Sequence, residues 1–394
     1  MKKDISHLID NVFEEVVTIR RQIHSNPELS GNEVETAALI SNILNKYNIS
    51  HETGIAGNGI IATIGTGTKP CVGIRADIDA LPIHEENIIE YASKKNGIMH
   101  ACGHDLHTAI LIGTGIILKN LEKDLEGTVK LIFEPSEETT GGAKPMIEAG
   151  CLLNPRTDTV IGLHVDPSLP SGQIQVCHGI MNAASTEFTI NIKGVSCHGA
   201  HPEKGVDAII AASNIVISIQ TISSRLNSAT TPVIVTIGQF NSGTKGNIIA
   251  GSATLIGIIR ALSNETREKI KKQLKQIVES TAAAHGATAE IIFNDSYPSL
   301  INDQSVTSIV ENAAKACLGE DKISYMKEPS LGADDFAYFA NSAKASYFNL
   351  GTNTPGVKDF QSLHSSKFLP DENSMKAGIL VEVEAVLKLL KLEV

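Results

Sequence analysis

The chain has no tryptophan, and aromatic residues make up only 4% of its 394 positions. It therefore offers few flat side chains on which the bases of a nucleic acid would stack. Its formal net charge is -11, and no run of basic residues interleaved with aromatic ones occurs. Because binding to a phosphate backbone requires clustered lysine and arginine, we expect no nucleic-acid partner.

Cysteine pairs and long apolar runs are also missing. The six cysteines are scattered without a Cys-x-x-Cys pair, which in a chain of this length does not indicate a disulfide framework. We therefore expect reduced thiols and a cytoplasmic location. The N-terminal segment lacks the apolar core of a signal peptide. No apolar run reaches the ~20 residues that span a bilayer, so we expect no membrane partner.

The length of the chain predicts two domains. In residues 1–182, short apolar runs alternate with helical patterns, which predicts an α/β domain with a mostly parallel sheet covered by helices. In residues 183–295, strands with one alternating face accompany two long helices, which indicates a smaller α+β domain with an antiparallel sheet. The α/β character returns in residues 296–394. We therefore expect one α/β domain made of two segments, with the smaller domain inserted between them.

Residues 100–107 read His-Ala-Cys-Gly-His-Asp-Leu-His, a thiol, three imidazoles and a carboxylate in one short segment. They run directly into an apolar, helix-like stretch at 108–118. A thiolate and an imidazole suit zinc, cobalt, nickel or manganese to differing degrees, so Cys102 and His104 are candidate metal ligands. On these two residues alone, a buried structural cysteine beside surface histidines would be the preferred interpretation.

Paired carboxylates and two further histidines extend the candidate site. Glu137 and Glu138 come shortly after the apolar run 129–133. Adjacent side chains in an extended segment diverge, so one carboxylate can ligate a metal while the other takes a proton from water, as metal-assisted hydrolysis requires. His164 ends another apolar run, where sites form in open α/β sheets, and His364 lies near the far end. The alternatives are a solvated acidic loop and histidines that are only hydrogen-bonded or exposed.

Several long motifs occur over essentially the whole chain. They are Arg21–Leu29 (RQIHSNPEL), Arg75–Pro82 (RADIDALP), Met99–Asp105 (MHACGHD), Glu137–Glu138 before Gly141–Ala143, Gly162–His164, Gly332–Phe336 (GADDF) and Leu363–Ser365. With these motifs the chain resembles the metal-dependent aminoacylase and carboxypeptidase family. The likeness is to its amidohydrolase branch of hippurate hydrolases, N-acetyl-amino-acid deacetylases and indoleacetyl-amino-acid hydrolases. The resemblance implies a zinc-exopeptidase-like α/β fold, with a mixed sheet flanked by helices and an inserted ferredoxin-like α+β domain.

Position by position, the resemblance implies five metal ligands and a general base. The ligands are Cys102, His104, Glu138, His164 and His364. Glu137 would act as general base and acid, and five ligands suggest two ions of zinc, manganese, nickel or cobalt. Related branches have a His-x-Asp motif where this chain has Arg75-Ala76-Asp77, so the histidine of that motif is missing here. We expect Asp77 in the catalytic site as a carboxylate that orients an imidazole, whereas Asp79 is interpreted as structural.

The same resemblance implies substrate contacts in the inserted domain, which would act as a lid and dimerisation domain. His198, Asn247 and Arg260 match family positions that contact the substrate. His198 is expected to reach the active site of the partner subunit in a homodimer, and the planar fork of Arg260 suits a carboxylate. A surface ion pair is the alternative for this arginine. Ala250 and Ile258 stand where the family often has proline and threonine, which leaves the identity of the substrate open.

We therefore expect a metal-dependent amidohydrolase that cleaves the amide bond of N-acyl amino acids or related small amides. One alternative is a di- or aminopeptide hydrolase of the same family. Another is a catalytically silent metal-binding homologue. Metal storage needs no free base beside the ligands, so the presence of Glu137 favours an enzyme.

Overall fold

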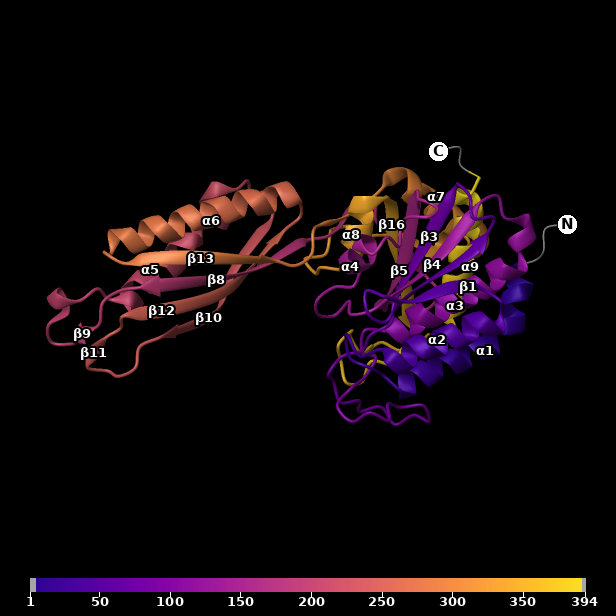
Figure 1. Ribbon diagram of the computed structural model, residues 1–394, viewed down its shortest axis with the longest axis horizontal. Helices are drawn as coiled ribbons and strands as arrows, with labels where there is room; N and C mark the ends of the chain where they lie inside the picture. Colours follow the sequence, from indigo (N-terminus) through magenta and orange to yellow (C-terminus); the bar gives the residue numbers. More distant parts are fainter. Residues whose placement is uncertain (1–4, 392–394) are drawn as a thin grey trace. The chain divides into compact units, whose positions relative to one another are not determined.

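The computed structural model describes residues 5–391, which form two compact units (Figure 1). The large unit contains residues 5–181, 301–328 and 335–391, and the small unit contains residues 182–300 and 329–334. Residues 1–4 and 392–394 are not described. The sequence predicts a first helix over Asp4–Ser25 and a last helix over Asn373–Glu393, and the outer ends of both lie outside the described residues.

An eight-stranded mixed sheet forms the centre of the large unit, in the order β1-β2-β4-β3-β5-β16-β6-β15. Its strands are β1 Ser50–Ile55, β2 Gly59–Gly65, β3 Cys71–Asp77, β4 Thr128–Glu134, β5 Thr159–Pro170, β6 Ile174–Val176, β15 Ile323–Tyr325 and β16 Lys344–Asn353. The central strands β4, β3, β5 and β16 run parallel. The pairs β1–β2, β2–β4 and β6–β16 are antiparallel. The predicted mixed sheet is confirmed, and the mostly parallel sheet expected from the alternation is correct only for the central strands.

Helices cover this sheet on both sides (Figure 1). They are α1 Ile5–Ser25, α2 Val34–Lys46, α3 His104–Asn120, α4 Ala143–Glu148, α7 Gln304–Leu318, α8 Phe336–Ser342 and α9 Ser374–Leu389. Helix α3 is buried along nearly its whole length, because its side chains are mostly apolar and it packs against α1, α9 and the sheet. Gly113 and Gly115 permit this close packing. A Cβ at Gly113 would lie 2.6 Å from Ile379, and one at Gly115 would lie 2.5 Å from Leu131.

The small unit is a four-stranded antiparallel sheet, ordered β10-β12-β8-β13, with two helices packed against it. Its elements are β8 Ala184–Lys193, β10 Val233–Ser242, β12 Ser252–Ala261, β13 Thr288–Asp295, α5 Ala208–Ile219 and α6 Asn264–Ala284. Figure 1 shows α6 lying along the sheet. Phe188 and Leu255 from the sheet pack with Ile215 of α5 and Leu274 of α6 in a core of their own. The small unit also contains the short pair of β9 Cys197–His198 with β11 Ile248–Ile249. A second short pair, β7 Gly179–Asn182 with β14 Leu300–Asn302, consists mostly of residues of the large unit.

Among the described residues, one helical stretch, Ala208–Leu226, is long and apolar enough by length and composition to cross a membrane. The expectation that no continuous apolar run reaches ~20 residues is not contradicted, because polar residues divide this stretch. Serine, asparagine and glutamine interrupt it, so a search for consecutive apolar residues misses it. Ala211, Ile215 and Ile219 on its inner side pack into the core of the small unit.

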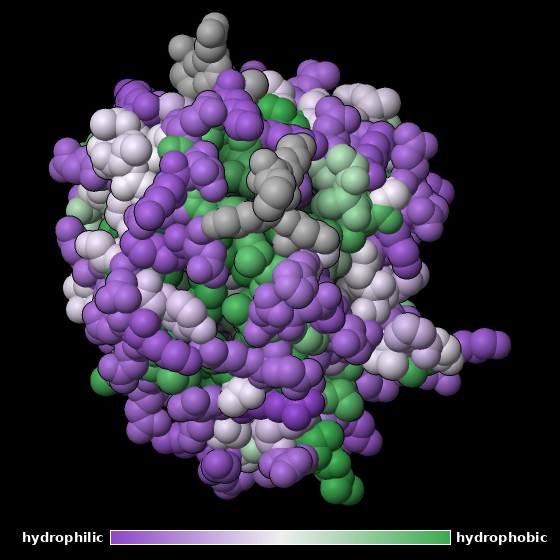
Figure 2. Space-filling model, turned by 90° about the vertical axis from the view of Figure 1, so that its right-hand side faces the viewer, coloured by the Kyte–Doolittle hydropathy of each residue, from purple (hydrophilic) through white to green (hydrophobic). Residues whose placement is uncertain are grey.

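The surface of the molecule is largely polar in the view of Figure 2. Hydrophilic side chains predominate over this face, and hydrophobic ones gather near its centre. This distribution agrees with a chain in which 20% of the residues are charged.

Candidate metal centre

Parallel strands of the large unit bring reactive groups to one edge of the sheet. Strand β3 ends at Asp77, β4 ends at Glu134, and β5 passes through His164. The register pairs Asp77 with Glu134. On the other side of β3, the pairing with β5 reaches Arg75 and Gly162. These strand ends therefore lie side by side at the carboxyl ends of the parallel strands, where ligand sites form in open α/β sheets.

Residues 100–107, which contain Cys102 and three histidines, lie beside these strand ends at the start of α3. The helix begins at His104 and not at Thr108, as the apolar pattern predicted, so His104 and His107 lie about one turn apart on one face. Gly103, directly before the helix, has a φ of 87°, a left-handed conformation that favours glycine. A Cβ at this position would also lie 2.5 Å from Val165. Glycine thus lets the segment approach β5 closely.

The five candidate ligands lie close together within the large unit. Cys102 Sγ is 3.5 Å from His164 Nε2. Glu138 Oε1 is 3.3 Å from His364 Nε2 and 3.8 Å from His104 Nε2. The ligand atoms of Cys102, His104 and His164 lie within 4.8 Å of one another, as do those of a second group, Cys102, Glu138 and His364. The two groups share the cysteine, so the structure brings together all five residues that the sequence predicted as ligands.

The donor atoms of this cluster fit a divalent cation. His104 Nε2 is buried without a hydrogen-bond partner. An unpaired buried polar atom costs about 1–3 kcal/mol, a cost that metal ligation would offset. His164 Nδ1–H donates to the Val165 carbonyl oxygen over 2.8 Å, which leaves its Nε2 for a metal. A mixed set of thiolate, imidazole and carboxylate ligands suits several borderline divalent metals.

The protonation of the cluster depends on its burial. Burial raises the pKa of the Cys102 thiol well above its usual range, so a cation is needed to favour the thiolate. Burial opposes protonation of His104, but the charge of Asp77 and the hydrogen bond to Asp79 outweigh it and raise the pKa of that imidazole. Burial also opposes ionisation of Glu138, yet its hydrogen bond to His364 and the charge of His104 lower its pKa. Metal binding would therefore displace protons from this cluster.

Asp79, rather than Asp77, holds the ring of His104. Asp79 Oδ1 accepts a hydrogen bond from His104 Nδ1 over 3.1 Å, and its Oδ2 accepts one from the Glu138 backbone N–H over 3.1 Å. One carboxylate thus orients two candidate ligands, a common arrangement around protein metals. Asp77 instead accepts from His107 Nδ1 over 2.6 Å. The interpretation of Asp79 as merely structural missed this contact, because nothing in the motif distinguishes the two aspartates.

A buried acid holds the turn that leads to the paired carboxylates. Ser136 has a φ of 64°, a left-handed conformation that is uncommon outside glycine. Glu33, which is fully buried, accepts hydrogen bonds from the Ser136 backbone N–H over 2.9 Å and from its hydroxyl over 3.2 Å. Glu137 follows, only 8% exposed, and its carboxylate lies within 4.8 Å of the ligand atoms of His104 and Glu138. The candidate base therefore lies beside the ligands. No sequence pattern had marked Glu33.

A family model for peptidase family M20/M25/M40 matches residues 73–388, which include all five candidate ligands. The chain belongs to this family. It is 37% identical to a putative amidohydrolase of Bacillus subtilis (strain 168) over 377 residues, which cover 95% of this chain and 94% of that protein. It is 35% identical to N-acetyl-L-cysteine deacetylase of the same organism over 384 residues, 97% of this chain and 90% of that one.

A solved structure supports the same family. It is that of a Bacillus subtilis protein described as a dinuclear metal binding peptidase from the M20 family. The TM-score is 0.84 and the identity is 33%, over 97% of this chain and 99% of that chain. The predicted family is confirmed, and with it the predictions of a hydrolase of amide bonds and of a divalent-metal site.

Two of the three candidate substrate contacts of this M20-family chain lie together in the small unit. His198 in β9 is followed by Gly199, whose N–H donates to the Asn247 carbonyl oxygen over 2.9 Å. Arg260 lies elsewhere, eight residues along β12 from Ser252, where that strand begins beside the segment leading to His198. At the rise of an extended strand this separation is about 25 Å. The small unit therefore does not bring Arg260 together with His198 and Asn247.

Arg260 is half-buried and forms no ion pair with any described residue. Its Nη1 donates to the Ser185 hydroxyl and to the Ile259 carbonyl oxygen. Burial lowers the pKa of its guanidinium. The surface ion pair considered as an alternative for this arginine does not occur among the described residues.

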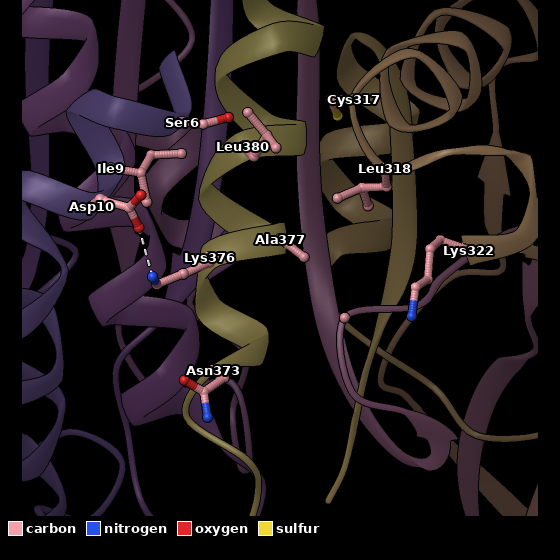
Figure 3. Close-up of a pocket in the computed structure, with 11 residues that line it drawn as sticks. Ser6, Ile9, Asp10, Cys317, Leu318, Lys322, Asn373, Lys376, Ala377 and Leu380 are labelled. Carbon is pink, nitrogen blue, oxygen red and sulfur yellow. Dashed lines mark hydrogen bonds and ion pairs between the residues drawn. The ribbon is translucent and has the colours of Figure 1, made fainter. Parts of the chain in front are cut away.

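A cavity elsewhere in the large unit is separate from the cluster. It has a volume of about 380 Å³ and is lined by Ser6, Ile9, Asp10, Gly172, Cys317, Leu318, Lys322, Asn373, Lys376, Ala377 and Leu380. Figure 3 shows Lys376 of α9 directed toward Asp10 of α1, with which it forms an ion pair of 2.6 Å. None of the candidate ligands lines this cavity, and neither does Glu137. The chemistry at the strand ends does not extend to it.

Proposed function

We propose that the protein cleaves the amide bond of N-acyl amino acids or related small amides, with water activated by two divalent metal ions. The proposed ligands are Cys102, His104, Glu138, His164 and His364. The proposed metals are zinc, manganese, nickel or cobalt, and Glu137 is the general base and acid. The observation that carries the proposal is the nearly buried carboxylate of Glu137 within 4.8 Å of the ligand atoms of His104 and Glu138.

Two observations support two ions. The candidate ligands form overlapping groups and exceed the four that one tetrahedral site uses. The similar solved structure is described as a dinuclear metal binding peptidase. The substrate class is supported by the 35% identity to N-acetyl-L-cysteine deacetylase, whose name gives an N-acyl amino acid.

We assign both proton transfers of the reaction to Glu137. A divalent metal bound in such a site lowers the pKa of water and polarises the amide carbonyl. Glu137 accepts the proton that the attacking water loses and delivers it to the departing amine nitrogen, a role that contributes about 10²–10⁴ in rate. Glu138 is less suited to this role, because its Oε1 lies 3.3 Å from His364 and its backbone N–H is bound to Asp79.

We also propose a homodimer formed through the small unit. Helix α5 exposes Ile209, Ile210 and Ile217, with 40%, 50% and 70% of their surface accessible. Strand β10 is an edge of the four-stranded sheet. Exposed apolar side chains and a free sheet edge are typical of an interface between copies. Because Arg260 lies about 25 Å along β12 from the end that begins beside the segment leading to His198, a site that contains both needs a second copy.

Light scattering on the full chain tests the homodimer. We expect a dimer for the wild type and a monomer for Ile217→Glu. A wild-type monomer would contradict the proposal, as would association with lipid vesicles in place of dimerisation. A cytoplasmic location is also proposed, because all six cysteines are free.

The alternative of a di- or aminopeptide hydrolase is favoured by the name of the peptidase family. A catalytically silent homologue is disfavoured, because metal ligation does not require the additional buried carboxylate of Glu137. A panel of N-acetyl amino acids, N-benzoyl amino acids and dipeptides, assayed with each of the four metals, separates these functions. We expect hydrolysis of at least one N-acyl amino acid. Cleavage of dipeptides alone would favour the peptidase, and no hydrolysis by protein with bound metal would contradict both enzymatic functions.

A further inference from the structure

We infer that His107 is a positioning residue for the proposed ligand His164. Its imidazole, fixed by Asp77, holds the backbone N–H of Val165 and thereby sets the direction in which the His164 ring points. The inference rests on the proposed function, because it takes His164 as a metal ligand. His107 itself touches neither substrate nor metal in this account.

The need for such a residue arises where two strands separate. The pairing between β3 and β5 ends at Arg75 and Gly162. Beyond that point β3 remains paired with β4 as far as Asp77, and β5 remains paired with β16 beyond His164. Backbone groups of β5 that face the lost partner must find other hydrogen bonds, because unpaired buried N–H groups are costly. His107, from the first turn of α3, occupies this position between the strands.

Both ring nitrogens of His107 are used in bridging the strands. Nδ1 lies 2.6 Å from Asp77 Oδ1, and Nε2 lies 3.0 Å from the Val165 backbone nitrogen. A backbone N–H can only donate, so Nε2 accepts and carries no proton, and Nδ1–H donates to the carboxylate. The ring is 2% exposed and has no free lone pair for a metal. This excludes His107 from the ligand set, although it belongs to the same histidine-rich segment as His104.

The carboxylate that fixes His107 is itself anchored. Asp77 Oδ2 forms an ion pair of 2.7 Å with Arg75 Nη1, and both side chains are fully buried. A separate hydrogen bond, from the Thr108 hydroxyl to the Asp77 backbone carbonyl oxygen over 2.9 Å, does not involve this carboxylate. Rigid, hydrogen-bonded supports of this kind hold metal-binding histidines in place in many proteins.

Val165 transmits the constraint to His164. Its N–H donates to His107 Nε2, and its carbonyl oxygen accepts from His164 Nδ1–H over 2.8 Å. The His107 and His164 rings also meet edge to face, with centroids 4.8 Å apart. A displacement of the Val165 backbone would therefore turn His164 Nε2 away from Cys102 Sγ, which lies 3.5 Å from it.

Four variants of the full chain separate positioning from packing. His107→Phe keeps a ring of similar size and removes both hydrogen bonds. His107→Asn keeps a donor for Asp77 but does not reach Val165, and it serves if the phenylalanine variant does not fold. His107→Gln offers both an amide N–H and a carbonyl oxygen. Thr108→Val is the matched control, because it removes a hydrogen bond to the Asp77 backbone on the same helix turn without changing the contact to Val165.

Cobalt binding to the metal-free proteins is measured in competition with a chelator. The visible spectrum of the bound cobalt and the thermal unfolding of the metal-free form are recorded for the same variants. We expect His107→Phe and His107→Asn to weaken one cobalt site by about 10–100-fold and to change its spectrum. His107→Gln should recover part of the affinity, and Thr108→Val should stay within about twofold of the wild type, since it leaves the support of His164 intact.

Wild-type affinity and spectrum in His107→Phe and His107→Asn would overturn the inference. Equal losses of cobalt affinity in these variants and in Thr108→Val, in proportion to their losses of thermal stability, would also overturn it, because that pattern indicates packing alone. His164→Ala, measured in parallel, tests the ligand assignment on which the proposed function rests. If it binds cobalt like the wild type, that assignment fails. If it loses a site while the His107 variants do not, only the positioning role fails.

Discussion

Glu382 should lower the free energy of unfolding as the pH rises, because burial raises the pKa of its carboxyl group. The side chain lies in α9 and is only 1% exposed. Burial raises its pKa from 4.5 to about 8, and the Thr114 hydroxyl, which donates to Glu382 Oε2 over 2.7 Å, opposes this rise only in part. The folded protein therefore keeps a proton that the unfolded chain releases from about pH 4.5 upward.

The sign and size of the effect follow from proton linkage. Because the pKa is higher in the folded state, Glu382 costs no stability below pH 4.5, where it is protonated in both the folded and the unfolded state. The free energy of unfolding falls as the pH rises toward about 8. One pKa unit corresponds to ~1.4 kcal/mol. The complete shift corresponds to a loss of about 5 kcal/mol, of which about 2–3 kcal/mol falls between about pH 5.5 and pH 7.5.

Glu382→Gln removes this titration and retains an acceptor for Thr114. We expect the wild type to lose about 2–3 kcal/mol of unfolding free energy relative to the variant between about pH 5.5 and pH 7.5. Urea unfolding of the metal-free chain, followed by circular dichroism, measures the difference without the pH dependence of metal binding. Glu384→Gln, at a partly exposed position on the same helix, is the matched control. The same pH dependence in wild type and Glu382→Gln would refute the reasoning.

Two further predictions concern residues that shape the site. Arg75→Lys should cost about 3–5 kcal/mol of unfolding free energy in urea, because one ammonium cannot replace a fully buried guanidinium that contacts three carboxylates; wild-type stability would contradict this. Gly103→Ala should weaken metal binding about tenfold in a chelator competition, since the φ of 87° and a Cβ 2.5 Å from Val165 would displace the ligand segment. Unchanged affinity would show that the segment tolerates the displacement.

Elements with an apolar pattern that is bounded by glycine or proline could be predicted from the sequence. The strand Thr128–Glu134 coincides with the apolar run at 129–133, because that run lies between a glycine and a proline. Strand β1, Ser50–Ile55, was missed because it is an edge strand with mostly exposed, polar side chains and has no alternation. The short helix α8, Phe336–Ser342, was also missed. The start of α3 was placed too late, because the polar His104 and His107 hide its first turn from an apolar pattern.

The candidate ligands could be named from the sequence, but the residues that support them could not. Asp79 and Asp77 stand two positions apart in one motif, and only the structure shows which imidazole each one meets. His107 resembles a ligand in sequence and is excluded only because its Nε2 accepts from the Val165 backbone. Such roles depend on where β3 and β5 separate, which is a property of the tertiary structure rather than of any local pattern.

The central claim is that Glu137 moves the proton in metal-dependent amide hydrolysis. The most direct test is the kcat of Glu137→Gln on the substrate that the wild type hydrolyses fastest, with the metal content of the same samples measured. We expect kcat to fall by about 10²–10⁴ while the metal content stays unchanged, because the carboxylate is removed but the ligands are not. Activity within about twofold of the wild type, with metal bound, would contradict the assigned role.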